Sequence, residues 1–267
     1  MSDIQAFKNR FCFNPAMAYH VGVERECFIT DIFGAIVPSA FEALAYMKKN
    51  PWQMPNGSDA DMAQAVGYEL SACQIETRTS PASIDTFEEE LAWQHTQLER
   101  SLHVLGLRPL HEELASESMP LDVYPDPTGR YAEITKSMPR EVLLAACRVT
   151  GTHVHVGMPD HETALRIYNK VIAKTDALCL EGDHSAGERL ATYRVVAPNP
   201  VPRPFDSWEH FHQIALEKGF AEDPRKCWTL IRISVHGTIE FRMFGATKDV
   251  GEIASWVRRC HELCISS

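Results

Sequence analysis

Apolar and polar residues alternate along several segments of this chain, as they do in strands that bury one face and expose the other. This alternation predicts strands at residues 19–30, 66–79, 148–158, 228–235 and 237–245. The last two should form a tight hairpin, because His236-Gly237 supplies the turn between them. Apolar residues at helical spacing, with capping and stop residues at the ends, predict helices at residues 39–49, 85–105, 160–180, 208–218 and 249–264, and another beginning near Arg140.

The connections between these elements indicate the fold class. Most strands are expected to be joined by hairpins, with the helices interspersed between them. Residues 50–62, 112–138 and 181–206 are rich in turn-forming residues and should be loops. This arrangement predicts an α+β fold in which helices cover one face of an antiparallel sheet.

Charged residues gather on one face of the predicted strands. Residues two apart in a strand point the same way, so each strand has an apolar side and a charged side. Glu76, for example, points away from its neighbour Ile75. The residues placed on the charged side are Glu24, Glu26, Glu76, His153, His155, Glu240 and Arg242.

This charged face has two interpretations. It can be the ordinary solvated side of an antiparallel sheet, which is common for any single strand. Its composition favours a site instead, because Glu and His dominate and neutralising Lys is lacking. Gathered carboxylates repel one another unless cations lie between them, and divalent ions with oxygen and imidazole ligands meet that need. Arg242 beside Glu240 would add a contact for a phosphate.

Composition excludes several functional classes. Lys and Arg number 26 against 36 Asp and Glu, a net charge of −10, and a nucleic-acid-binding protein would carry a basic patch. No segment reaches the roughly 20 apolar residues that span a membrane. The first residues lack a secretory signal, and the eight scattered cysteines form no C-x-x-C pair, so we expect a cytoplasmic protein with reduced thiols. Cys260, His261 and Cys264 are interpreted as core packing rather than a zinc site.

Common nucleotide and hydrolase motifs are absent from the sequence. There is no G-x-x-x-x-G-K-[ST], no G-x-G-x-x-G and no G-x-S-x-G. Any bound nucleotide would therefore be held through metals and side chains.

The motifs on the charged face resemble, in order, those of the type-2 glutamate–cysteine ligases, also called carboxylate–amine ligases. The resemblance extends over roughly residues 20–250, and its most specific string is T-G-T-H-V-H-V-G at residues 150–157. The other matching segments are Gly22-Val23-Glu24-Arg25-Glu26, Glu69 with Gln74-Ile75-Glu76-Thr77, Ala191-Thr192-Tyr193-Arg194 and Thr238-Ile239-Glu240-Phe241-Arg242.

The resemblance implies a glutamine synthetase-like fold whose concave sheet face binds ATP with Mg²⁺ or Mn²⁺. It implies an enzyme that phosphorylates a carboxylate, typically the γ-carboxylate of glutamate, and forms an amide with an amine such as cysteine. The implied metal ligands are Glu24, Glu26, Glu69, Glu76, His153 and Glu240. His155, Arg242 and Arg194 would contact nucleotide or substrate, and Glu240 and Arg242 would take part in catalysis. Glu69 lies seven residues before Glu76, so it reaches this face only if the chain turns or bulges between them.

The sequence departs from the family pattern in three places. Arg25 stands where the family has an acidic residue, and alternation points it away from the site. The segment before Arg194 is shorter than in the family, and the chain stops about one helix after Arg242. We therefore expect a single catalytic domain over residues 1–267 with a shortened C-terminus, and an exposed edge that favours a homo-oligomer.

Two other functions stay open on the sequence. A metal-dependent amide hydrolase would use His153 and His155 with carboxylates around Zn²⁺ and would act without ATP. A non-catalytic family member would bind nucleotide or amino acid without turnover. In each case the partners are small molecules, with no nucleic acid and no membrane.

Overall fold

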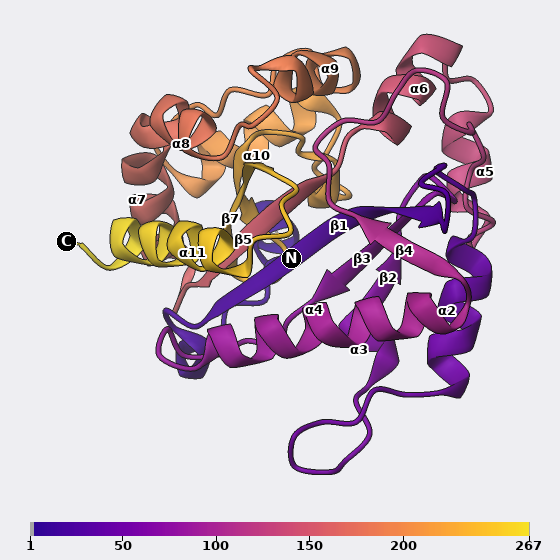
Figure 1. Cartoon of the computed structure of the whole chain (residues 1–267). Helices are drawn as coiled ribbons and strands as arrows, with labels where there is room; N and C mark the ends of the chain where they lie inside the picture. Colours follow the sequence, from indigo (N-terminus) through magenta and orange to yellow (C-terminus); the bar gives the residue numbers. More distant parts are fainter. Residues whose placement is uncertain (1–2, 267) are drawn as a thin grey trace.

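An antiparallel sheet forms the centre of the molecule in the computed structural model, which describes residues 3–266 (Figure 1). Within these residues the sheet has seven strands, and β1 and β5 lie at its middle. The strand order is β2 (Val66–Tyr68), β3 (Gln74–Arg78), β1 (Val21–Asp31), β5 (Gly151–Gly157), β7 (Thr238–Gly245) and β6 (Ile231–Ser234), and β4 (Leu107–Leu110) pairs with the C-terminal part of β1.

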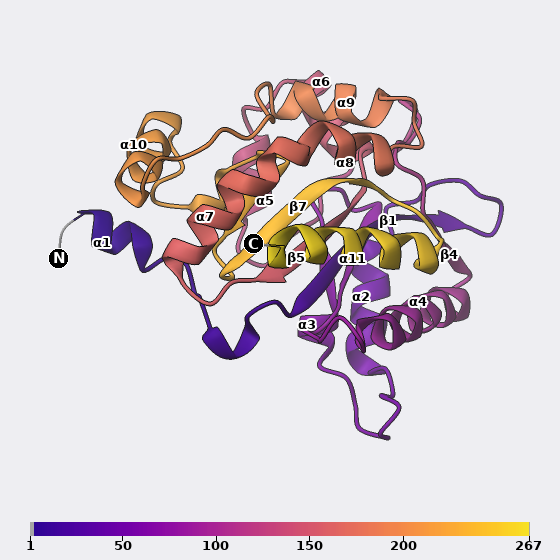
Figure 2. The ribbon, with the colours of Figure 1, turned by 90° about the vertical axis from the view of Figure 1, so that its left-hand side faces the viewer.

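Helices cover one face of this sheet, as Figure 2 shows most clearly for α4 and α11. Alternating apolar residues of β1, β5 and β7 meet those helices, and Val154, Ile239 and Phe241 are fully buried there. The helices are α1 (Asp3–Lys8), α2 (Ala40–Lys49), α3 (Met62–Ala65), α4 (Phe87–Val104), α5 (Arg130–Thr135), α6 (Arg140–Arg148), α7 (His161–Val171), α8 (Thr175–Glu181), α9 (Glu188–Val196), α10 (Trp208–Lys218) and α11 (Val250–Ile265). Short 3₁₀ turns occur at Pro15–Met17, Ile172–Lys174 and Pro224–Lys226. The predicted helix-covered antiparallel sheet is therefore confirmed.

The hairpin of β6 and β7 has the predicted turn. Gly237 adopts a left-handed conformation with φ of 72°, which glycine tolerates without strain. Cys260 and Cys264 face the core from α11, as the sequence predicted.

Three sequence predictions need correction. Residues 66–79 are two strands joined by a turn, because β2 folds back on β3. The helix predicted over residues 160–180 is broken by a 3₁₀ turn at Ile172–Lys174. The predicted loops at 112–138 and 181–206 contain the short helices α5 and α9, and α5 depends on Asp126, whose carboxylate accepts bonds from the first backbone N–H groups of that turn.

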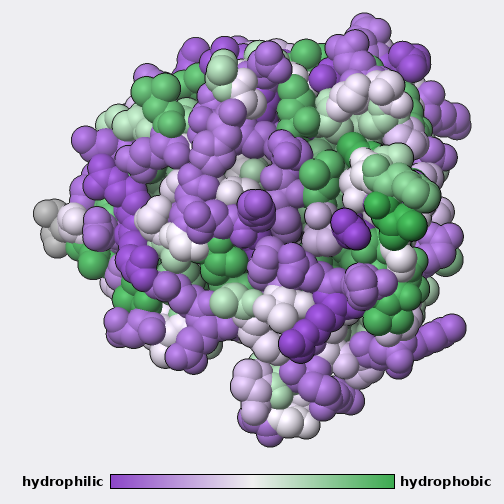
Figure 3. All heavy atoms as spheres, in the orientation of Figure 1, coloured by the Kyte–Doolittle hydropathy of each residue, from purple (hydrophilic) through white to green (hydrophobic). Residues whose placement is uncertain are grey.

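The surface seen in Figure 3 is largely hydrophilic, with separate apolar areas between the charged residues. Large exposed apolar side chains such as Phe33 and Leu180 come from different elements. None of the helices in residues 3–266 has a stretch that is long and apolar enough to cross a membrane.

Candidate functional site

Strand register brings the predicted charged residues side by side. Glu24 of β1 lies opposite His153 of β5, and His155 lies opposite Glu240 of β7. On the other side of β1, Glu26 lies opposite Glu76 of β3. Directly opposed residues of antiparallel strands point to the same face. The carboxylates and imidazoles therefore share one face of the sheet.

Two groups of possible metal ligands lie on this face and share His153. Ligand atoms of Glu24, His153 and Glu240 lie within 4.8 Å of one another, and so do those of Glu26, Glu76 and His153. Mixed carboxylate and imidazole donors at this separation fit a divalent cation. The described residues therefore offer ligands for one or two ions at the centre of the sheet.

The two histidines are held by specific contacts. His153 Nδ1 lies 3.1 Å from a Glu24 carboxylate oxygen, and its Nε2 lies 3.8 Å from Glu26. His155 Nδ1 bonds to the Thr238 hydroxyl at 2.8 Å, and its Nε2 lies 3.5 Å from Glu24. Burial alone would raise the pKa of Glu24, but His155 and His153 hold that pKa well below its usual value.

Glu240 is fully buried between two guanidinium groups. Arg232 Nε donates to one of its carboxylate oxygens at 2.6 Å, and Arg242 donates to the other. Burial would raise the pKa of Glu240, and the two arginines instead hold it well below its ordinary value. The carboxylate therefore stays ionised and fixed in place.

The carboxylates nearer β2 have raised pKa values, whereas those of Glu24 and Glu240 are lowered. Burial, and then the charge of Glu26, raise the pKa of Glu69 to about 8. Burial and the neighbouring Glu24 and Glu69 raise the pKa of Glu76 well above its usual value. Arg78, 3.6 Å from Glu76, offsets only part of this crowding, and a bound cation would offset more of it. This donor set therefore fits a divalent metal.

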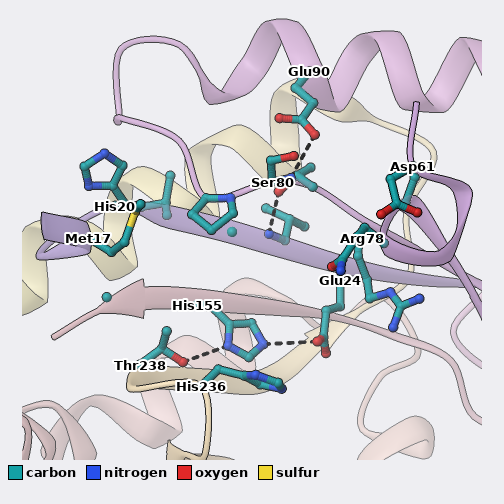
Figure 4. A pocket seen from close by; sticks show the side chains of 18 of the residues that line it. Met17, His20, Glu24, Asp61, Arg78, Ser80, Glu90, His155, His236 and Thr238 are labelled. Carbon is teal, nitrogen blue, oxygen red and sulfur yellow. Dashed lines mark hydrogen bonds and ion pairs between the residues drawn. The ribbon is translucent and has the colours of Figure 1, made fainter. Parts of the chain in front are cut away.

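A cavity of about 780 Å³ opens beside this cluster. Glu24, His155 and Thr238 line it at the cluster, and Arg78, the register partner of Glu24, lines it beside Glu24 on the side of Asp61, the residue before α3 (Figure 4). His155 Nε2 faces the Glu24 carboxylate at 3.5 Å, beyond which the cavity opens (Figure 4). Charged and polar side chains line the cavity where it meets the cluster, so it suits a polar ligand.

Of the predicted residues Glu69 and Arg194, only Glu69 lies on the charged face. Glu69 joins the face because the chain turns between β2 and β3: Gly67 pairs with Glu76, and Glu69 is two residues beyond Gly67. Arg194 is exposed on α9, and no contact described for residues 3–266 joins it to the charged face. The buried arginine from α9 is Arg189, which donates to the carbonyls of Thr150 and Met243.

Several residues of the site were missed from the sequence. Arg232 was within reach of prediction, because a hairpin turning at His236-Gly237 places it opposite Glu240. Arg78 was also within reach, because it lies two residues after Glu76 in the same strand. Arg189 carries no such signal, since a helix brings it in from another part of the chain. Two glycines leave room for these arginines. A side chain at Gly67 would clash with Arg78, and one at Gly151 would clash with Arg189.

Comparison with known proteins gives matches along most of the chain. Residues 20–177 match the family described as "Glutamate-cysteine ligase family 2", and residues 119–264 match one described as "Putative amidoligase enzyme". A "Putative glutamate–cysteine ligase 2" of Gloeobacter violaceus is 25% identical over 264 residues, covering 90% of this chain and 66% of that protein. A "Glutamate–cysteine ligase" of Haloferax volcanii is 25% identical over 267 residues, covering 92% of this chain and 70% of that protein. This chain thus spans about two thirds of the length of these relatives.

A solved structure shares the fold. The chain superposes on a bifunctional glutathione synthetase from Pasteurella multocida with a TM-score of 0.60 and 13% identity, covering 97% of this chain and 39% of that one. The predicted α+β class with a glutamine synthetase-like fold is confirmed.

Proposed function

Because the chain belongs to glutamate–cysteine ligase family 2, we propose that it is an ATP-dependent carboxylate–amine ligase. The proposed reaction activates a carboxylate, the γ-carboxylate of glutamate, and joins it to an amine such as cysteine through a C–N bond. The observation that supports it best is the paired ligand set around His153, with Glu240 and its two arginines beside it. Positive groups beside clustered carboxylates suit the transfer of a phosphoryl group.

The metal would be held by residues that already face one another. Glu24, His153 and Glu240 form one half of the proposed ligand set, and Glu26 and Glu76 complete the other half, with Glu69 close by. Mg²⁺ or Mn²⁺ bound there would neutralise phosphate oxygens of ATP and the charge that develops on them during transfer.

The remaining residues orient the reactants. Arg242, fixed by Glu240 and lying over the Trp228 ring at 5.9 Å, would contact a phosphate or an acyl-phosphate oxygen. His155, fixed by Thr238 through Nδ1, would offer its Nε2 to the nucleotide. Glu240 would keep Arg242 in position while it serves as a ligand, which is the catalytic role that we propose for this pair.

The experiment that tests the proposal is ADP release with Mg²⁺ and ATP, measured with glutamate and a panel of amines that includes cysteine. A ligase should release ADP only when both a carboxylate and an amine are present, together with one amide product per ADP. Cleavage of amides without ATP would show the hydrolase. Binding of ATP without ADP release under any pairing would show the non-catalytic family member.

Three further expectations stay predictions alongside the ligase. They are that residues 1–267 act as one catalytic unit, that the protein is cytoplasmic and that it forms a homo-oligomer. Light scattering after size exclusion tests the last of these, and a monomeric mass would contradict it.

A further inference from the structure

The cavity beside the proposed metal site is lined by a second group of charged side chains. One side of the cavity, at Glu24 and His155, belongs to the charged face of the sheet. Another side is formed by three carboxylates from outside the sheet, which we call the acidic wall: Asp59 and Asp61 from the segment before α3, and Glu90 from α4. Figure 4 shows Asp61 and Glu90 across the cavity from His155. The cavity therefore connects the proposed reaction centre to an acidic surface.

Each carboxylate of the acidic wall is held through one oxygen and keeps the other one free. Asp61 Oδ1 caps α3 by accepting a backbone N–H of its first turn at 3.0 Å. Glu90 Oε1 accepts the backbone N–H of Ser80 at 2.8 Å, and Asp59 Oδ1 accepts a bond from the side chain of Gln53. The second oxygen of each carboxylate has no hydrogen-bond partner within residues 3–266. Asp59 and Asp61 are exposed and Glu90 is half-buried, so a ligand in the cavity can reach these oxygens.

No basic side chain of the described residues neutralises the acidic wall. Its three carboxylates form no ion pair there, and Arg78 is the one Lys or Arg among the described residues that line the cavity. Arg78 is already engaged, because its Nη2 donates to two backbone carbonyls and its Nε lies 3.6 Å from Glu76. His155 lies against Glu24 at 3.5 Å. Burial, and then the charge of His155, lower the pKa of His236, so that this imidazole is neutral at neutral pH. The negative charge of the acidic wall is therefore unbalanced.

This charge selects the class of ligand. Unbalanced carboxylates attract a cation and repel an anion. They would repel the phosphates of ATP, which would stay at the proposed metal ligands and at Arg242. An acceptor amine with its own carboxylate, such as cysteine, would also be disfavoured at the acidic wall. An amine with a second positive charge would be favoured.

The rest of the cavity suits a chain of methylene groups. Met17, Met54 and Trp93 also line it, and an aromatic ring can contact a cation as well as an apolar chain. The volume is about 780 Å³, compared with about 560 Å³ for a second cavity lined by His111 and Lys248. Cavities of several hundred Å³ hold ligands larger than a single small amino acid. An extended amine therefore fits beside an activated carboxylate.

We propose that the amine acceptor of this protein is an aliphatic diamine whose second ammonium group lies at the acidic wall. The proposal rests on the ligase function proposed above and names its second substrate. One nitrogen, as the free amine, attacks the acyl phosphate: the C–N bond forms, the C–O bond to phosphate breaks, and a proton passes from the nitrogen to the released phosphate. The other nitrogen stays protonated and pairs with Asp59, Asp61 and Glu90. These three residues bind the substrate and take no part in the bond changes.

Three amines with four carbons separate the charge of the distal group from the length of the chain. ADP release is measured with Mg²⁺, ATP, glutamate and either 1,4-diaminobutane, butylamine or 4-aminobutyrate, whose distal groups are positive, neutral and negative. The value of kcat/KM should be at least tenfold higher for the diamine than for butylamine, 4-aminobutyrate or cysteine. The same comparison with the matching six-carbon compounds covers a longer acceptor, and preference for the diamine in either series supports the proposal.

Two substitutions test whether the acidic wall causes this preference. Asp61→Asn removes the charge and keeps a residue that caps helices well, and Glu90→Gln keeps the size of the side chain. The double variant should lower the ratio of kcat/KM for the diamine to kcat/KM for butylamine at least tenfold, mainly through a higher KM for the diamine. Glu89→Gln is the matched control, because Glu89 is exposed on α4 and does not line the cavity, and it should keep the ratio of wild type. Unchanged circular dichroism would verify the fold of each variant.

The outcomes separate this inference from the ligase proposal. Absence of ADP release with every amine would overturn both. ADP release with cysteine or 4-aminobutyrate at a kcat/KM equal to or above that of the diamines would keep the ligase and overturn the diamine. An unchanged ratio in the double variant would also overturn it, and a raised KM for ATP in that variant would then assign the acidic wall to the nucleoside.

Discussion

Glu240 shows how one side chain is kept both buried and charged. Its two oxygens are bonded to Arg232 and Arg242, and those arginines are anchored in turn by backbone carbonyls of Arg225 and Cys227 and by the ring of Trp228. Burial lowers the pKa of Arg242, but the charge of Glu240 more than reverses that effect, and the pKa of Arg242 is raised. The pair is therefore fixed before any substrate arrives.

Replacing this carboxylate by an amide tests its proposed role. Glu240→Gln keeps the size and removes the charge, so turnover in the ADP-release assay should fall at least about 100-fold. Circular dichroism should show the fold retained. Glu262→Gln, an exposed change on α11, is the control. A fully active Glu240→Gln protein would contradict the site assignment.

His111 gives a prediction about acid stability. Burial, and then the charge of Arg25, lower the pKa of His111 from its ordinary value of 6.5 to about 3. The unfolded chain therefore binds a proton between these two values that the folded chain does not, and stability falls as pH decreases from about 6.5 toward 3.

When the pH falls from 7 to 5, His111 should lower the free energy of unfolding of wild type by about 2 kcal/mol. Urea denaturation at pH 7 and at pH 5 measures this loss. In His111→Asn the loss in free energy of unfolding should be about 2 kcal/mol smaller than in wild type. His103→Asn, an exposed change on α4, should behave as wild type. An equal loss in wild type and His111→Asn would show that His111 is not the group that titrates.

At the scale of elements, alternation in β1 separates the charged face of the sheet from its helix-covered face. Glu24 and Glu26 face the proposed metal site, while Arg25 and Cys27 face the helices. This division was predictable, because a strand reverses its side chains at every residue. The β5–β7 pairing was less predictable: a register shift between Thr152 and Val154 changes the alternation late in β7, and sequence period alone does not reveal a bulge.

Loops and short helices set the limit of sequence-based prediction. Glu113 lies outside the predicted strands, and its contact to the chain near Gly245 depends on tertiary packing. On α9, Arg189 is buried and Arg194 is exposed, although both are ordinary arginines of one short helix with no clear apolar stripe. Likewise no strand was predicted at residues 107–110, yet β4 forms there as an edge strand, in which Pro109 is tolerated.

The apolar side of β7 should carry much of the stability. Phe241 is fully buried between the sheet and its helices. Phe241→Ala should lower the free energy of unfolding by about 3–5 kcal/mol, measured by urea denaturation. Val195→Ala, at an exposed position of α9, should change it by less than about 0.5 kcal/mol. A small effect for Phe241→Ala would contradict the packing described for this face.

At the scale of the whole molecule, the crowded carboxylates of the charged face should make the free energy of unfolding depend on bound divalent metal. A saturating divalent ion at about 100 times its dissociation constant adds about 2.7 kcal/mol. For a chain of this size that raises the melting temperature by roughly 5–10 °C. Mg²⁺ or Mn²⁺ should therefore stabilise wild type in a thermal melt, and EDTA should reverse the effect.

Glu76→Gln should abolish most of this shift, because it removes a proposed ligand, and it should also stabilise the metal-free protein by removing like-charge repulsion. Glu217→Gln, exposed on α10, should retain the full shift. A shift of the same size in Glu76→Gln would exclude that residue as a ligand.

The N-terminal segment supports the site from outside the residues that the family model matches, which begin at residue 20. The Cys12 N–H donates to the carbonyl of Val235 at 2.9 Å, and Gly237 is packed so closely on Cys12 that no side chain would fit there. That turn carries His236 and Thr238 into the larger cavity. A fragment cut at residue 20, where the family match begins, would keep every proposed metal ligand and lose the support beneath this wall. The ends of deletion variants should therefore be chosen so that they keep the packing of residues 12–13 on Gly237, and not from the limits of the family match. Affinity tags should be placed at the C-terminus.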